Sequence, residues 1–312
     1  MRLVSIRHLT RYRYGRAVAF GEHRMMFRPR ESYDQRVLSA RLTITPTPAR
    51  LRYVEDVFGN CVGIATFVGR ARELTFESRV ELEHAPAPAF SVREGEAEAH
   101  VGAMPLAYSP EDMPDLSRSM ERHYPDPEGA VEFWARRFVR RVGPTSLRGL
   151  LSEMTREIHD NFAYQPRPDG AAQAPEQTLR LGRGSCRDFA ILMIEAARSL
   201  GLAARFVSGY VYSPSPAAAR LGSAGGGHTH AWACVYLPAC GWVEFDPTNG
   251  LVGASDLVRV AVTRDPRQAA PLHGTWDGFA ADFLGMDVEV DVTSADLTVA
   301  REVSRRQRAS AA

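Results

Sequence analysis

The stretch with the clearest chemical potential is residues 184–201, GSCRDFAILMIEAARSLG, because it places a cysteine at the start of a predicted helix. Ser185, followed three residues later by Asp188, has the form of a capping box, which makes Ser185 the N-cap and Cys186 the first helical residue. Free backbone N–H groups and the positive end of the helix dipole face such a cysteine and stabilise a thiolate. Taken alone, however, Cys186 is better explained as a small buried residue at a helix start than as a nucleophile.

A cysteine nucleophile needs a base that takes its proton and a third group that orients the base. His230 lies 44 residues after Cys186 (230 − 186), at the start of a predicted strand, and Asp246 follows 16 residues later (246 − 230), near the end of the next strand. The three residue types therefore occur in an order that could build a Cys-His-Asp triad.

Strand parity tests whether His230 and Asp246 can meet, because side chains alternate between the two faces of a sheet. A two-residue turn at 239–240 would place them on opposite faces. A three-residue turn at 238–240 sets Leu237 opposite Gly241 and brings both onto one face, and Gly241 suits the left-handed position that closes such a turn. The triad therefore requires the second register.

The elements that must position these residues belong to an α+β protein. Residues 1–85 contain short β segments with partial alternation and turn signals such as Phe58-Gly59-Asn60, which predict an antiparallel β domain. Helical patterns are expected at about 128–141 and 146–162, and strands at about 204–212, 256–263 and 286–293, besides the pair around 238–241. The predicted organisation is a β domain at 1–95, a connector at 96–127, a catalytic core at 128–295 and a flexible tail at 296–312.

Composition excludes several functions. With 312 residues, of which 45% are hydrophobic and 24% charged, the chain can bury a sizeable core. The formal net charge of +1 gives no field that would favour nucleic acid or an anionic membrane, so we expect neither as a partner. No signal peptide or transmembrane segment is visible, and four cysteines in a chain of this size suit a reducing compartment, so a cytoplasmic location is expected.

No cofactor is expected, and a metal site is disfavoured because Cys234 and Cys240 do not form a C-x₂-C pair. A zinc site formed by His228, His230 and Cys234 is the alternative that this region leaves open.

Three motifs, GSCRDFA, HTHAW and GWVEFDPTN, resemble the core of the bacterial transglutaminase-like superfamily. The opening segment, HLTRYRYGRAVAFGEHRMMFRPR, is similar to the β domain that precedes this core in one bacterial branch. The resemblance covers roughly residues 1–80 and 150–290. It implies a papain/transglutaminase-like core in which the catalytic helix packs on an antiparallel sheet.

Transferred residue by residue, the resemblance implies that Cys186 is the nucleophile, His230 the general base and acid, and Asp246 the orienting carboxylate. The family pattern places histidine directly before Ala-Trp, which favours His230 over His228. The eukaryotic members take an oxyanion donor from a tryptophan upstream of the cysteine, and this chain has none between residues 134 and 186. Tyr164 is the substitute candidate, and Trp232 is a candidate for the wall of the cleft.

The expected reaction is acyl transfer through a thioester, with hydrolysis of a peptide or side-chain amide bond favoured. Amine-accepting cross-linking and a non-catalytic binding module on the same fold are the alternatives. The substrate is expected to be a peptide or protein amide, selected by the loops at 164–178 and 213–228. The oligomeric state is left open.

Overall fold

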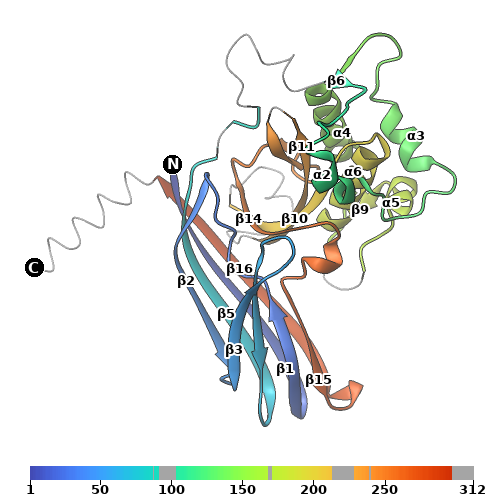
Figure 1. Ribbon diagram of the computed structural model, residues 1–312. Coiled ribbons are helices and arrows are strands. Elements are labelled where there is room, and N and C mark those ends of the chain that lie inside the picture. The colour runs from blue at the N-terminus through green and yellow to red at the C-terminus, as the bar shows by residue number, and fades with distance from the viewer. Residues whose placement is uncertain (87, 91–102, 168–170, 213–227, 239, 297–312) are drawn as a thin grey trace, which may run out of the picture.

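The structure is a computed structural model, and it describes residues 1–86, 88–90, 103–167, 171–212, 228–238 and 240–296. Two sheets dominate it, and the helices gather around one of them while the long strands of the other extend away (Figure 1). The expected α+β class is therefore confirmed. The predicted tail and the loop at 213–227 lie outside the described residues.

The first sheet is antiparallel and built on one long strand, β1 (Arg2–Met25). Its order is β2-β5-β1-β4-β3, so that β2 and β3 are the edge strands of this path. The bounds of these partners are β2 (Gln35–Thr45), β3 (Arg50–Glu55), β4 (Cys61–Thr66) and β5 (Arg70–His84).

Two strands from the far end of the chain also pair with β1, namely β15 (Leu272–Asp277) and β16 (Phe283–Asp296). The 3-10 turns Pro266–Gln268 and Ala280–Asp282 flank β15. The sequence assigned these residues to a core spanning 128–295, whereas their strands complete the first sheet. Alternation identifies a strand but carries no information on which sheet it joins, because pairing partners are selected by tertiary packing.

The second sheet is antiparallel, with the order β13-β12-β11-β10-β14. Its strands are β10 (Ala204–Val211), β11 (His228–Leu237), β12 (Gly241–Asp246), β13 (Leu251–Val252) and β14 (Leu257–Thr263).

The helices are α2 (Met113–Met120), α3 (Ala130–Arg136), α4 (Leu147–Asn161), α5 (Pro175–Leu181) and α6 (Cys186–Ser199). Short strand pairs join β6 (Ala103–Met104) to β7 (Thr145–Ser146) and β8 (Ala163–Tyr164) to β9 (Arg183–Gly184). The expected connector thus carries α2, and the two helices expected before residue 162 are present.

Helix α6 lies in the largest apolar core, between the second sheet and the other helices. Met193 and Ala197 of α6 are fully buried there, as are Ala233 and Phe245 of the hairpin β11–β12. This burial fixes the helix against the strands that carry His230 and Asp246, and it confirms the predicted packing of the cysteine helix on an antiparallel sheet.

Side-chain amides join the two sheets at the edge strand β14. The Gln35 amide donates to the Arg259 carbonyl at 2.8 Å and accepts from its N–H at 3.0 Å. Asn60 does the same for Val262, at 3.0 and 2.9 Å. Because an unpaired strand edge leaves backbone groups without partners, these amides take the place of a neighbouring strand. The Arg259 guanidinium also forms ion pairs with Asp34, which directly precedes β2, and with Glu244 of β12.

Two histidines from the first sheet are buried against a tyrosine of β10 and a tyrosine that directly follows it. His8 Nδ1 lies 2.9 Å from the Tyr210 hydroxyl, and His84 Nδ1 lies 2.9 Å from the Tyr212 hydroxyl. Burial lowers the pKa of each histidine from 6.5 to about 4. Both imidazoles are therefore neutral in the folded protein at neutral pH.

This interface is expected to weaken in acid. Since the unfolded chain binds protons at these histidines before the folded chain does, their contribution is complete above pH 6.5 and is lost as the pH falls toward 4. We expect the free energy of unfolding to fall by about 2 kcal/mol per histidine between pH 7 and 5. Urea unfolding of the parent and of the His8→Gln/His84→Gln variant measures this, with His273→Gln as an exposed control. A double variant that loses stability as steeply as the parent would contradict the assignment.

Among the described residues, no helix combines the length and the apolar character needed to cross a membrane.

Candidate active site

Cys186 is the first residue of α6, and Ser185 caps the helix as the sequence predicts. The Asp188 carboxylate accepts from the Ser185 backbone N–H at 2.7 Å and from its hydroxyl at 2.9 Å. The predicted capping box is confirmed, and Asp188, which is fully buried, fixes the helix start directly beneath the cysteine.

Asp188 also anchors the chain that precedes the helix, which the sequence did not indicate. Its carboxylate accepts from the Arg167 guanidinium at 2.6 and 2.7 Å and from the Gln173 backbone N–H at 2.7 Å. A single buried carboxylate thus ties the described parts of the loop at 164–178 to the N-terminus of α6. Nothing in the local pattern around Arg167 distinguishes it from a solvent-exposed arginine.

The hairpin β11–β12 has the register that the triad requires. Leu237 pairs with Gly241 and Val235 with Val243, as the three-residue turn predicts. Gly241 adopts a left-handed φ of 72°, which a side chain would disfavour. His230 and Asp246 consequently share a face of the sheet, and His230 Nε2 lies 2.8 Å from Asp246 Oδ2.

The charges of this pair are coupled. Burial opposes a positive charge on His230, but the Asp246 carboxylate, its hydrogen bond and a hydrogen bond with the Cys186 side chain outweigh burial and raise the pKa of His230 to about 10. Burial would likewise raise the pKa of Asp246, yet His230 and the Asn249 donors hold it below its usual value. At neutral pH the arrangement favours an imidazolium between a carboxylate and the cysteine sulfur, which is the charge state that stabilises a thiolate.

Asn249 is a member of this cluster that sequence reasoning missed. Its side-chain amide donates to Asp246 Oδ2 at 2.7 Å and lies 3.2 Å from His230 Nε2. The backbone N–H groups of Thr248 and Asn249 donate to Asp246 Oδ1, at 3.0 and 3.3 Å. The motif Asp-Pro-Thr-Asn is the signal that could have indicated this, because asparagine and threonine after an aspartate are typical of a turn that returns donors to its carboxylate.

Tyr164 lies beside the cysteine. Its short strand β8 runs parallel to β9, which directly precedes Ser185, and Tyr164 pairs with Gly184. Burial, followed by the charge of Cys186 and a hydrogen bond with Cys186, raises the pKa of Tyr164 above its usual range. The phenol therefore keeps its proton and can act as a donor next to the sulfur.

Trp232 has a different place from the one expected. It is fully buried, it stacks on His230 with ring centroids 6.0 Å apart, and it packs in an apolar cluster with Val207 and Leu257. A side chain with no exposed surface does not form the wall of an open cleft. The Trp232 ring instead stacks on the His230 imidazole.

The alternative of a zinc site gains no support from the geometry. Within the described residues, no group of three or more histidine, cysteine, aspartate or glutamate side chains could hold a metal ion. His230 Nε2 faces Asp246, and the side chain of His228 lies outside the described residues.

The site thus brings together a helix-start cysteine, an imidazole held by a buried carboxylate and a neighbouring phenol. The chain belongs to the transglutaminase-like superfamily. Residues 134–247 match the transglutaminase-like superfamily, and residues 4–83 match the bacterial transglutaminase-like N-terminal region. The resemblance noted in the sequence is thereby confirmed for both parts of the chain.

Curated relatives match this chain over different lengths. The uncharacterized protein Rv2569c of Mycobacterium tuberculosis is 30% identical over 298 residues, covering 92% of this chain and 91% of that protein. ML0607 of Mycobacterium leprae is 35% identical over 127 residues, covering 41% of this chain and 44% of that protein.

A crystal structure of a candidate cysteine protease from Cytophaga hutchinsonii superposes with a TM-score of 0.68 at 18% identity, covering 95% of this chain and 92% of that one. At this identity the likeness concerns the fold.

Proposed function

We propose that the protein is a transglutaminase-like cysteine hydrolase that cleaves a peptide or side-chain amide bond through a thioester. The observation that carries the proposal is the hydrogen-bonded line from Cys186 through His230 to Asp246, anchored at the N-terminus of a buried helix. A structural cysteine would not need a base and an orienting carboxylate beside it.

In the proposed mechanism the Cys186 thiolate attacks the amide carbonyl carbon, and the π electrons move to the carbonyl oxygen. The N–H groups at the start of α6 stabilise this oxyanion. Collapse of the tetrahedral intermediate breaks the C–N bond, and His230 gives its proton to the departing amine. A water molecule, deprotonated by His230, then attacks the thioester; breakage of the C–S bond releases a carboxylic acid and restores the Cys186 thiolate beside protonated His230.

Tyr164 is proposed as a second oxyanion donor, because its protonated phenol lies beside the sulfur. Tyr164→Phe removes the hydroxyl and keeps the ring, so we expect kcat to fall about 10²-fold while the reaction of Cys186 with iodoacetamide, which forms no oxyanion, changes little. Tyr33→Phe, at an exposed position, is the control. Equal losses in both assays would instead mean that the hydroxyl acts on the thiol itself.

The proposed substrate is a peptide or protein amide, with no nucleic acid and no membrane as partner. A cytoplasmic location is proposed as well, supported by the four cysteines, all of which are free thiols. Amine-accepting cross-linking follows the same first half-reaction, and the two outcomes differ only in which nucleophile reaches the thioester.

The test is mass spectrometry of Cys186 after incubation with a peptide library. An acyl group trapped on Cys186, and released as acid in water, supports the hydrolase. The same thioester with transfer to an added primary amine supports cross-linking. A protein whose Cys186 is never acylated and reacts with iodoacetamide no faster than Cys240 is a binding module on this fold, and the proposal fails.

A further inference from the structure

The Asp246 carboxylate, which is fully buried, is surrounded by four N–H groups. Oδ1 accepts from the backbone N–H groups of Thr248 and Asn249, at 3.0 and 3.3 Å. Oδ2 lies 2.8 Å from His230 Nε2 and accepts from the Asn249 side-chain amide at 2.7 Å. Because an ionised carboxylate has about four lone-pair sites, each site faces a nitrogen and none is open for a proton.

The side chains of Asn249 and His230 converge on one oxygen. Asn249 Nδ2 lies 3.2 Å from His230 Nε2, and Asp246 Oδ2 is within hydrogen-bond distance of both nitrogens. The amide oxygen cannot take the place of Nδ2, because two acceptors would then face each other. Two N–H donors can share this oxygen only when it carries no proton, so the arrangement requires the ionised form of Asp246.

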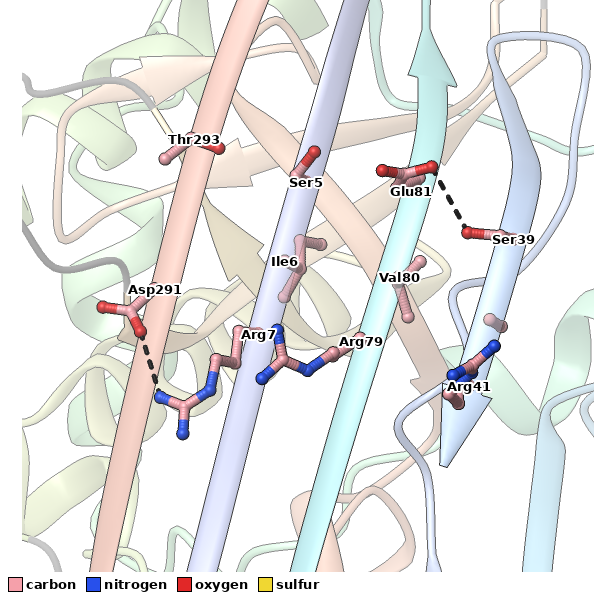
Figure 2. Close-up of a pocket in the computed structure, with 11 residues that line it drawn as sticks. Ser5, Ile6, Arg7, Ser39, Arg41, Arg79, Val80, Glu81, Asp291 and Thr293 are labelled. Atoms are coloured by element: carbon pink, nitrogen blue, oxygen red, sulfur yellow. Dashed lines mark hydrogen bonds and ion pairs between the residues drawn. The ribbon is translucent and has the colours of Figure 1, made fainter. Parts of the chain in front are cut away.

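Other carboxylates of the chain are held by arginines. On the outer face of the first sheet, the exposed Asp291 contacts Arg7 at 3.3 Å (Figure 2). The buried Asp188 pairs with Arg167 at 2.6 Å. Among the described residues Asp246 has no arginine partner, and its one ion pair there is with the histidine. The charge of Asp246 therefore depends on the imidazole and on N–H donors alone.

The turn that follows β12 fixes the place of Asn249. His159 of α4 lies with Nδ1 2.9 Å from the Thr248 carbonyl oxygen. Gly250 adopts a left-handed φ of 67°, and a Cβ at this position would come within 3.0 Å of the His159 ring. The turn is thus packed against α4, and a fixed backbone presents the Asn249 amide to Asp246.

The other end of this amide lacks a hydrogen bond. Asn249 is more than nine-tenths buried, yet its Oδ1 has no partner within the described part of the chain. A buried polar atom without a partner lowers the stability of the fold. Packing alone does not account for such an atom, so the contacts of Nδ2 are the ones that explain this residue.

We propose that Asn249 is a positioning residue that keeps the Asp246 carboxylate ionised and aligned with the His230 imidazole. Burial opposes both charges of this pair, and Asn249 supplies two of the N–H donors that offset it on the carboxylate. The titratable groups that act on the pair from other elements are Cys186 of α6 and Tyr164 of β8. The inference rests on the proposed function only in taking Cys186 as the nucleophile.

Asn249→Leu removes the side-chain donor and fills its space, and Asn249→Ala removes it without added bulk. The measurement is the rate of Cys186 alkylation by iodoacetamide as a function of pH, followed by mass spectrometry of each cysteine peptide. In both variants the acid midpoint of this rate is expected to rise by about one pH unit. The rate below the midpoint then falls about tenfold, as is typical for one lost hydrogen bond to a charged group. Asn161→Leu, at an exposed asparagine of α4, is the matched control.

Alkylation of the half-buried Cys240 reports whether each variant stays folded at each pH. Upward shifts in both Asn249→Leu and Asn249→Ala, with none in Asn161→Leu, support the proposal. An unchanged profile in both variants, or a shift in only one of them, overturns it, because loss of the donor is what the two share. A parent protein whose Cys186 reacts no faster than Cys240 overturns the proposed function as well, so the two failures are distinguishable.

Discussion

Cys186→Ala is expected to abolish turnover of any amide that acylates the parent protein, with a loss of about 10⁴-fold or more in kcat. The reason is that no other group in the cluster can form the thioester, and removal of one member of a catalytic unit removes most of its effect. The measurement is the release of product from a peptide identified in the library, by mass spectrometry.

Cys240→Ala is the matched control, since this cysteine is also a half-buried free thiol but lies at the turn of the hairpin. It should retain full activity. Thermal unfolding of both variants distinguishes a loss of catalytic chemistry from a loss of stability. The comparison is matched, because each substitution removes one small side-chain group. Retention of hydrolysis by Cys186→Ala would rule out the proposed nucleophile.

Asp246→Asn is expected to lower kcat by a similar factor, about 10⁴-fold, through loss of the charge that holds His230 protonated. In the parent, burial opposes protonation, and the carboxylate and its hydrogen bond overcome this to give a pKa of about 10. Without the carboxylate, burial dominates, so the His230 pKa should fall below 6.5 and the imidazolium should be lost at neutral pH.

The rate at which Cys186 reacts with iodoacetamide measures this change directly. At pH 7 we expect the rate to fall at least about tenfold in Asp246→Asn, because the imidazolium beside the sulfur is lost. Asp277→Asn, an exposed position in β15, is the control. Identical pH profiles for the parent and Asp246→Asn would show that the pair does not activate the thiol.

The same pair has a defined effect on stability. His230 has a raised pKa, so its contribution is complete below pH 6.5 and is lost as the pH rises toward 10. Asp246 has a lowered pKa, so its contribution is present above pH 3.8 and is lost in more acidic solution. The difference in unfolding free energy between the parent and Asp246→Asn should therefore be largest between pH 3.8 and 6.5.

Local patterns were sufficient to predict the elements of the candidate site. The apolar stripe and the capping box placed Cys186 at a helix start, and the turn at 238–240 determined the register that joins His230 to Asp246. Both predictions succeeded because they depend on interactions between residues that are close in sequence. Once the turn length is set, parity decides which side chains of the two strands share a sheet face.

Contacts between distant segments could not be predicted in this way. The pairing of β16 with β1 joins residues almost 300 positions apart, and the same alternating pattern would suit either sheet. The anchoring of residues 167 and 173 on Asp188 likewise depends on how a loop folds back over α6.

The sequence by itself determined the family, the triad candidates and the local geometry of the helix and the hairpin, because periodicity, caps and turns act over a few residues. Only the tertiary structure decided that Cys186 meets His230, that the buried Trp232 stacks on the imidazole, and that Asn249 completes the charge cluster. It also decided that strands from the two ends of the chain share one sheet. These outcomes depend on which apolar faces bury one another, and many segments of one sequence carry equally suitable faces.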